Sequence, residues 1–242
     1  MYKMETTTTN DLKKFKAQIT RFLMVYKFGL DEIKTKIEIL KQEFQYVHDY
    51  NPIEHVASRI KSPESILKKV RKKGCELSLP SIRENINDIA GIRIICSFTS
   101  DIYKVSEMLQ KQENMRIIEC KDYIKNPKPN GYQSLHLIME VPVFLSDRTE
   151  KVRVEAQIRT IGMDFWASLE HKIYYKCNKE VPEKLRNELM DAAITVRQLD
   201  MKMEQLNKEI SEIKESTSLE YETQEIVINN QKFYLPKDFF KA

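Results

Sequence analysis

The apolar residues of this chain follow helical spacing at its two ends and strand spacing in its middle. Across residues 12–47 they recur every three or four positions, which predicts one helix, or two helices bent near Gly29. A second helix is expected from Ser62–Pro63 to Gly74, because proline suits a first helical turn and glycine suits a C-terminal cap.

Short segments rich in β-branched and aromatic residues predict the central elements. The expected elements are strands at 91–98, 116–124, 132–143 and 152–160, with a helix at 101–112.

The segment 152–160, VRVEAQIRT, shows the strictest alternation. Its apolar residues share one face of a strand, and Arg153, Glu155, Gln157 and Arg159 share the other. This polar face is expected either to line a site for an anionic substrate or to be the solvated face of an antiparallel sheet.

Helical spacing returns after the last central strand, over residues 162–176 and 182–214. The second of these segments keeps a heptad seam, so it packs either on its own domain or on another subunit. A short hairpin is expected over 225–235. The order of helices, strands and helices predicts an α+β fold with a long C-terminal helix.

Composition narrows the class of protein. The chain has 242 residues, 41% hydrophobic and 31% charged, which is enough for one sizeable core. No segment approaches the roughly 18 apolar residues of a membrane span, and the N-terminus lacks a signal-peptide core. Four cysteines without a CxxC pair argue against a zinc site or disulfides and favour a cytoplasmic location. A net charge of +4 does not require a nucleic-acid partner.

A basic cluster surrounds the second helix. Arg59 and Lys61 precede it, and Ser65, Lys69 and Lys72 lie on one of its faces, with apolar residues on the other. Such a surface suits a polyphosphate or an RNA backbone. It also has the composition of an ordinary solvated lysine face.

A carboxylate lies at the edge of the 91–98 strand. Asp88 precedes that strand, and Arg93 lies within it. Mg²⁺ binds one or two carboxylates together with substrate phosphates, so Asp88 is a candidate ligand. The alternative is that Asn87 or Asp88 caps a turn.

The loop before the 132–143 strand contains Asn130–Gly131, which predicts a tight turn. Such a turn exposes Tyr132 for stacking on a base, with His136 on the same face. Glu170–His171 lacks HxxE-type metal spacing, so a zinc site there is not expected. The pair His48–Asp49 resembles one in metal-dependent phosphohydrolases, but no other histidine lies near enough in sequence to complete such a site, so a structural role is expected.

Several motifs together resemble the synthetase domain of RelA/SpoT-type enzymes, in the form of a stand-alone small alarmone synthetase. They are DIAGIR at 88–93, KDYI at 121–124, NPKPNGYQSLH at 126–136, EAQIRT at 155–160 and EH at 170–171. The resemblance covers residues 45–205 and implies a mixed sheet of nucleotidyltransferase type with flanking helices. The expected divisions are a helical extension at 1–50, a synthetase core at 51–178, and a helix and tail at 179–242.

The resemblance implies Mg²⁺-dependent transfer of pyrophosphate from ATP to the 3′-hydroxyl of GTP or GDP, with release of AMP. It implies a homotetramer, and it allows RNA as a partner without requiring it. A chain without a hydrolase domain is expected not to degrade its product.

The same resemblance implies a role for each candidate residue. Arg59 and Arg93 are expected to bind adenine, and the ATP phosphates are assigned to Lys61, Ser65, Lys69 and Lys72. The guanine nucleotide is assigned to Lys121, Tyr132, His136, Gln157 and Arg159. The carboxylates assigned to catalysis and to Mg²⁺ are Asp88 and Glu155, with Glu155 as the base for the 3′-hydroxyl.

Two positions depart from some relatives, namely Gln133 and Asp164, and they leave the preference among GTP, GDP and GMP open. One competing function is a non-catalytic RNA- or nucleotide-binding regulator, which gives no reason for Asp88 and Glu155. A second is a nucleotidyltransferase that releases pyrophosphate instead of AMP.

Overall fold

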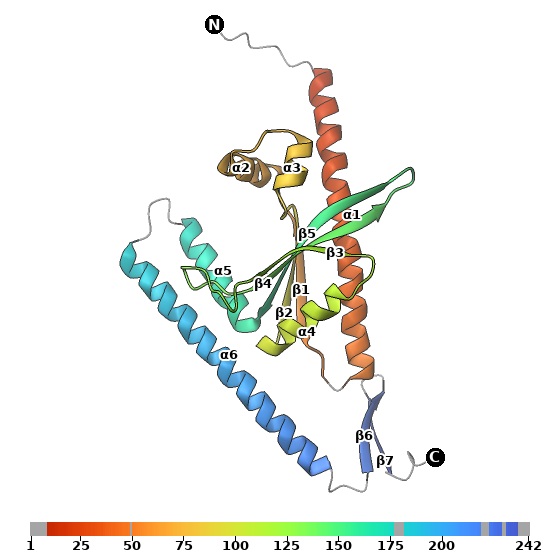
Figure 1. Cartoon of the computed structure of the whole chain (residues 1–242), viewed down its shortest axis with the longest axis vertical. Coiled ribbons are helices and arrows are strands. Elements are labelled where there is room, and N and C mark those ends of the chain that lie inside the picture. The colour runs from red at the N-terminus through yellow and green to blue at the C-terminus, as the bar shows by residue number, and fades with distance from the viewer. Residues whose placement is uncertain (1–8, 49, 177–181, 219–222, 229–230, 237–242) are drawn as a thin grey trace.

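The computed structural model describes the chain except for residues 1–8, 49, 177–181, 219–222, 229–230 and 237–242 (Figure 1). Five strands form one mixed sheet in the order β1-β2-β5-β4-β3. They are β1 (Ile53–Ile60), β2 (Ala90–Cys96), β3 (Arg116–Asp122), β4 (Leu135–Phe144) and β5 (Thr149–Thr160). Only the β2–β5 pair among them is parallel, so the expected mixed sheet is confirmed.

Six helices and a separate hairpin complete the described fold. The helices are α1 (Thr9–Val47), α2 (Pro63–Lys73), α3 (Leu79–Asn85), α4 (Thr99–Gln110), α5 (Ile161–Lys176) and α6 (Glu183–Ser218). The hairpin pairs β6 (Thr223–Ile228) with β7 (Gln231–Pro236), as the sequence predicted. Figure 1 shows α1 along one side of the sheet and α5 and α6 along the other.

One hydrophobic core joins the helices to the apolar face of the sheet. The alternating residues of β5, from Val152 to Ile158, are buried in the same cluster as apolar residues of α1 and α4. Helix α1 runs continuously through Gly29, so the alternative with two bent helices is wrong. A Cβ at Gly29 would lie 2.3 Å from Cγ2 of Val152, and glycine therefore lets α1 approach β5 closely.

Two elements, β1 and α3, were not predicted. β1 is an edge strand whose register shifts between Ile53 and His55, and this irregularity removes the alternation by which a strand is detected. Helix α3 has seven residues and begins in the sequence Ser78-Leu79-Pro80, a composition that is also typical of loops.

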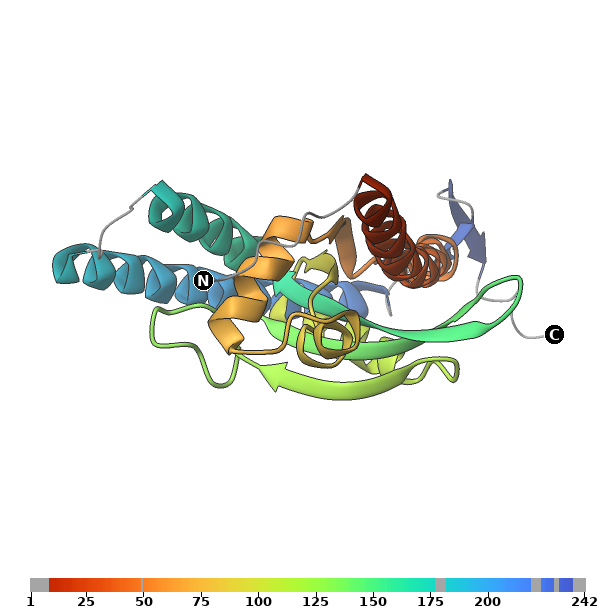
Figure 2. The same cartoon turned by 90° about the horizontal axis from the view of Figure 1, so that it is seen from above.

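Helix α6 is attached to the rest of the molecule near its N-terminal half. The Trp166 indole Nε1 donates to the Leu189 carbonyl oxygen at 3.0 Å, and Thr160 Oγ1 donates to Asp200 Oδ2 at 2.7 Å. Figure 2 shows α5 and α6 side by side.

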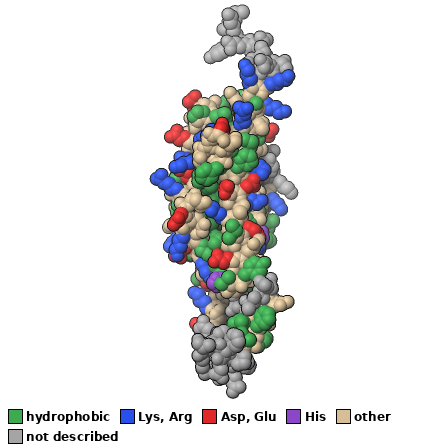
Figure 3. All heavy atoms as spheres, turned by 90° about the vertical axis from the view of Figure 1, so that its right-hand side faces the viewer, with side chains coloured by type: hydrophobic (Ala, Val, Ile, Leu, Met, Phe, Trp, Pro, Cys, Tyr) green, Lys and Arg blue, Asp and Glu red, His purple; other side chains and the backbone are tan. Residues whose placement is uncertain are grey.

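Figure 3 shows the side of the molecule that faces away from α5 and α6, where charged side chains of both signs are interspersed with apolar ones. Within the described ranges, no helix is long and apolar enough to span a membrane.

Candidate active site

Most of the predicted site residues meet on the polar face of the sheet. Gln157 on β5 pairs with Arg93 on β2 and with His136 on β4, and His136 pairs in turn with Lys121 on β3. Directly paired residues share a face, so four strands contribute side chains to one surface. Glu155 lies on the same face of β5 as Gln157.

A cavity of about 140 Å³ lies at the centre of this surface. Its polar and charged lining includes Arg59, Asp88, Arg93, Glu155 and Gln157. Both predicted catalytic carboxylates therefore border the same space, together with the two arginines assigned to adenine.

Asp88 lies in the turn before β2, between two lysines. Lys61 and Lys69 both contact its Oδ2 atom, and the Lys69 Nζ distance is 2.6 Å. Burial favours a higher pKa for the Asp88 carboxyl, but the hydrogen bonds from the two lysines outweigh it and hold the pKa below the usual value. Asp88 is consequently an ionised carboxylate in a basic environment.

The second oxygen of Asp88, Oδ1, is buried and has no hydrogen-bond partner among the described residues. A buried carboxylate oxygen without a partner is costly unless a cation or a donor satisfies it, so this atom fits a Mg²⁺ ligand. The described residues form no cluster of three or more His, Cys, Asp or Glu side chains. A metal held here would take its remaining ligands from substrate phosphates and water, as Mg²⁺ usually does.

Both oxygens of Glu155 are bonded. Oε1 lies 3.2 Å from His136 Nδ1, and Oε2 accepts from Gln157 Nε2 at 2.9 Å. Burial favours a higher pKa for Glu155, but its interactions with His136 and Gln157 lower the pKa below the usual value. Glu155 is therefore ionised and able to accept a proton.

Arg159 joins the site to the loop before β4. It is only 4% exposed, and its guanidinium donates to Tyr132 Oη at 2.5 Å and to Gln157 Oε1 at 2.6 Å. It also donates to Ser134 Oγ at 3.3 Å and to Asp164 Oδ1 at 3.2 Å. This network fixes the orientation of the predicted guanine-binding residues relative to β5.

Tyr132 is held at both ends. Its hydroxyl lies 2.8 Å from His136 Nε2, and its ring packs against the cluster of Trp166 and Ala193. Burial raises the pKa of the Tyr132 hydroxyl. Lys128 Nζ lies 4.6 Å from the centre of the Tyr132 ring. A base that stacks on this face of the ring would therefore displace the Lys128 ammonium.

Three predicted residues lie at the edge of the site. Ser65 lies in the first turn of α2 and accepts a hydrogen bond from Ser62, and Lys72 is exposed in the last turn. Lys121 pairs with Glu119 at 2.9 Å. On the apolar face of α2, Ile66 and Val70 are buried, whereas Leu67 is exposed.

His48, Glu170 and His171 do not line the cavity. His48 packs its ring on Phe44 in α1, and its neighbour Asp49 lies outside the described residues. Glu170 accepts a hydrogen bond from Asn130 Nδ2 at 3.1 Å, which supports the loop before Tyr132. His171 is exposed on α5.

Asp164 was noted in the sequence only as a departure from some relatives. Its Oδ1 lies 3.0 Å from Arg93 Nη1 and 3.2 Å from Arg159 Nη1. It therefore links the arginine assigned to adenine with the one assigned to the guanine nucleotide. Asp164 lies in the first turn of α5, directly after β5. This position in the sequence could have suggested that Asp164 contacts the site.

A family model described as a region found in RelA / SpoT proteins matches residues 58–180, which contain all the charged residues that line the cavity and the loop before β4. The chain belongs to the RelA/SpoT family. The match confirms the family that the motifs predicted.

Similar proteins of this family are small synthetases. GTP pyrophosphokinase YwaC of Bacillus subtilis is 54% identical over 207 residues, which cover 86% of this chain and 99% of YwaC. The crystal structure of small alarmone synthetase 2 from Bacillus subtilis is 55% identical, with a TM-score of 0.72 over 78% of this chain and 98% of that one.

Small alarmone synthetase 1 from Bacillus subtilis, in the structure bound to its product pppGpp, is 37% identical with a TM-score of 0.75. That alignment covers 80% of this chain and 98% of the other. The mixed sheet with flanking helices is thus the fold of these RelA/SpoT synthetases.

Proposed function

We propose that the protein transfers the pyrophosphoryl group of ATP to the 3′-hydroxyl of GTP or GDP, giving pppGpp or ppGpp and AMP. The observation that carries this proposal is the pair of ionised carboxylates, Asp88 and Glu155, that border one cavity among cationic side chains. The names of the similar synthetases support the same reaction class.

ATP is proposed to bind over β1, β2 and α2. Arg59 is exposed and Arg93 lines the cavity, so both are accessible to an adenine ring, on which guanidinium groups stack well. Three lysines and a serine extend from this position along α2, from just before its first turn to its last turn. The residues proposed to bind the ATP phosphates are Lys61, Ser65, Lys69 and Lys72.

The acceptor is proposed to bind over β3, β4 and β5. Tyr132 offers its ring to the guanine base, and the residues proposed for the ribose and phosphates are Lys121, His136, Gln157 and Arg159. Their hydrogen-bonded network supports this assignment, because it holds polar groups in fixed positions before substrate binds.

In the proposed reaction, the acceptor 3′-oxygen forms a bond to the β-phosphorus, and the bond between this phosphorus and the oxygen of the α-phosphate breaks. AMP leaves with that electron pair, and Glu155 takes the proton of the 3′-hydroxyl. Mg²⁺, held by Asp88 and shared with Glu155 or the phosphates, would neutralise phosphate charge. Lys61 and Lys69 supply positive charge next to Asp88.

Isotopic labelling tests the reaction directly. The protein is incubated with Mg²⁺, GTP and ATP that carries label on either the β- or the γ-phosphate. Both labels are expected in the guanosine product, because the pyrophosphoryl group moves intact. Release of labelled pyrophosphate would instead show a nucleotidyltransferase, and nucleotide binding without turnover would show a regulator.

The proposed working form is a homotetramer in the cytoplasm. Helix α6 exposes a row of large apolar residues, namely Leu199, Met203, Leu206 and Ile210. Such a surface is typical of an interface between subunits.

The free thiols of Cys75, Cys96 and Cys120 fit a reducing compartment. The proposed core remains residues 51–178, between the extensions at 1–50 and 179–242.

A further inference from the structure

Asp88 lies in a connection, not in a regular element, so its position depends on the contacts of that connection. Helix α3 ends at Asn85 and β2 begins at Ala90. Ile86 and Ile89 are fully buried on either side of Asn87 and Asp88. These two buried isoleucines hold both ends of the turn in the core. They do not by themselves decide in which direction the side chains of Asn87 and Asp88 point.

Arg153 of β5 adds two polar contacts to this turn, beside the backbone hydrogen bond from Lys61 N to the Ile89 carbonyl oxygen. Its Nη1 atom donates to Asn87 Oδ1 at 2.9 Å and to the Glu84 carbonyl oxygen at 2.7 Å. Arg153 precedes Glu155 by two residues, so both side chains leave the same face of the strand. The strand that carries Glu155 thus also holds the residue next to Asp88.

We infer that Arg153 is a positioning residue, which holds the turn of Asp88 against β5 so that Asp88 and Glu155 face one cavity. The inference rests on the proposed function. Arg153 is not among the residues that line the cavity, and it acts through Asn87. Residues that orient a metal ligand from outside typically change metal affinity about 10- to 100-fold when they are replaced.

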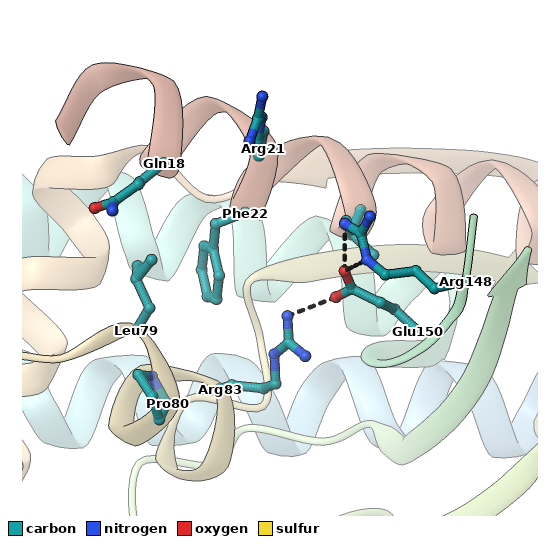
Figure 4. Close-up of a pocket in the computed structure, with 9 residues that line it drawn as sticks. Gln18, Arg21, Phe22, Leu79, Pro80, Arg83, Arg148 and Glu150 are labelled. Carbon is teal, nitrogen blue, oxygen red and sulfur yellow. Dashed lines mark hydrogen bonds and ion pairs between the residues drawn. The ribbon is translucent and has the colours of Figure 1, made fainter. Parts of the chain in front are cut away.

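A second anchor of α3 provides a matched control (Figure 4). Arg83 Nη2 lies 2.7 Å from Glu150 Oε2, and Arg148 Nη2 lies 2.8 Å from Glu150 Oε1. These residues line a separate cavity of about 550 Å³ between α1, α3 and the start of β5. Arg83 also ties α3 to β5, but its contacts are with Glu150 and the Phe22 ring and not with Asn87 or Asp88.

The test measures Mn²⁺ binding by electron paramagnetic resonance, with the non-hydrolysable ATP analogue AMPCPP present. The full-length variants are Arg153→Met, Asn87→Ala, their double mutant and Arg83→Met. The first two should each weaken Mn²⁺ binding by about 10-fold or more. The double mutant should match the weaker-binding single variant to within about twofold, because both substitutions remove the hydrogen bond between Arg153 and Asn87.

Three results would overturn the inference. The first is an Mn²⁺ affinity of Arg153→Met equal to that of the unmodified protein. The second is an additive effect of Arg153→Met and Asn87→Ala in the double mutant. The third is a loss of Mn²⁺ affinity in Arg83→Met as large as that in Arg153→Met. If Arg153→Met does not fold, the Mn²⁺ affinities of Asn87→Ala and Arg153→Lys are compared with that of the unmodified protein instead. Turnover adds a second readout, in which kcat falls and the KM for GTP stays within about twofold.

Failure of the inference differs from failure of the proposed function. If labelled pyrophosphate is never transferred by the unmodified protein, the function is wrong, and the Mn²⁺ comparison still decides the role of Arg153. If transfer occurs and Arg153→Met binds Mn²⁺ normally, the function stands without the positioning role.

Discussion

Asp88 and Glu155 differ in the atoms that remain available to substrate. Asp88 presents a buried oxygen with no partner among the described residues, whereas both oxygens of Glu155 are bonded to neighbours. His136 and Gln157 therefore orient Glu155 before substrate binds, and Asp88 is the stronger candidate for the metal. The two carboxylates share one cavity, and these contacts support different proposed roles for them.

Loss of either carboxylate should abolish most turnover. Glu155→Gln removes the proposed base, and Asp88→Asn removes the negative charge of the proposed metal ligand, so each is expected to lower kcat by at least about 10²-fold. AMP production measures the rate, and circular dichroism verifies the fold. Near-normal AMP production by a folded variant would exclude that residue from the mechanism.

The acid side of the pH profile should reflect the lowered pKa values of these carboxyls. The fall in kcat/KM is expected below about pH 4, the ordinary range of Asp and Glu. Ionisation of these carboxyls stabilises the fold at pH values above their pKa in the unfolded chain. This contribution is lost as the pH falls through their lower pKa in the folded protein. Thermal unfolding of Glu155→Gln between about pH 5 and 3 should consequently depend less on pH. A kinetic midpoint near pH 6 would identify another group.

Tyr132 should matter more to the guanine nucleotide than to ATP. Tyr132→Ala removes a stacking surface worth about 1–3 kcal/mol, so the KM for GTP should rise about 5- to 150-fold. Tyr132→Phe keeps the ring and loses only the hydroxyl contacts with Arg159 and His136, so its effect should be smaller. Steady-state kinetics with each substrate varied in turn give both values. A larger effect on ATP would contradict the assignment.

At the scale of elements, the sequence predicted those whose periodicity is regular. The strict alternation at 152–160 gave both the buried and the polar face of β5. β1 escaped prediction because a register shift disrupts its alternation, and α3 because seven residues hold too little periodicity. The contacts of Asp164 with two arginines and of Arg153 with Asn87 join distant segments, which local spacing does not report.

The loop before β4 rests on α6 at Gly131. Its φ of +86° suits glycine, and an added Cβ would lie 2.5 Å from Ala193 Cβ. Gly131→Ala should therefore shift Tyr132, raise the KM for GTP, and lower the melting temperature by several degrees. Ala193→Gly should restore part of the loss by removing the clash while leaving the backbone strain. Unchanged kinetics in Gly131→Ala would show that the loop does not depend on this contact.

At the scale of the whole molecule, α6 has two surfaces with different environments. One packs on α5 and the loop before β4, and the other exposes Leu206 and Ile210 at 41% and 53%. An exposed apolar row of this kind is costly in a monomer, and the proposed symmetric assembly would bury it.

Charges on the exposed row should dissociate the proposed tetramer. Leu206→Glu combined with Ile210→Lys is expected to lower the mass in solution without unfolding the sheet. Light scattering at micromolar concentration measures the mass, and circular dichroism serves as the control. A monomer mass for the unmodified protein would show that the row needs no partner, and the assembly would be rejected.

The position of β2 in the sheet also sets the order in which a newly made chain acquires its site. β2 lies between β1, which precedes it, and β5, which is synthesised much later. Until β5 has left the ribosome, one edge of β2 stays unpaired, and the cavity beside Asp88 lacks Glu155. A nascent or truncated chain that ends before β5 consequently has an open strand edge and lacks Glu155, the proposed proton acceptor. Such fragments are candidates for degradation before any alarmone is made.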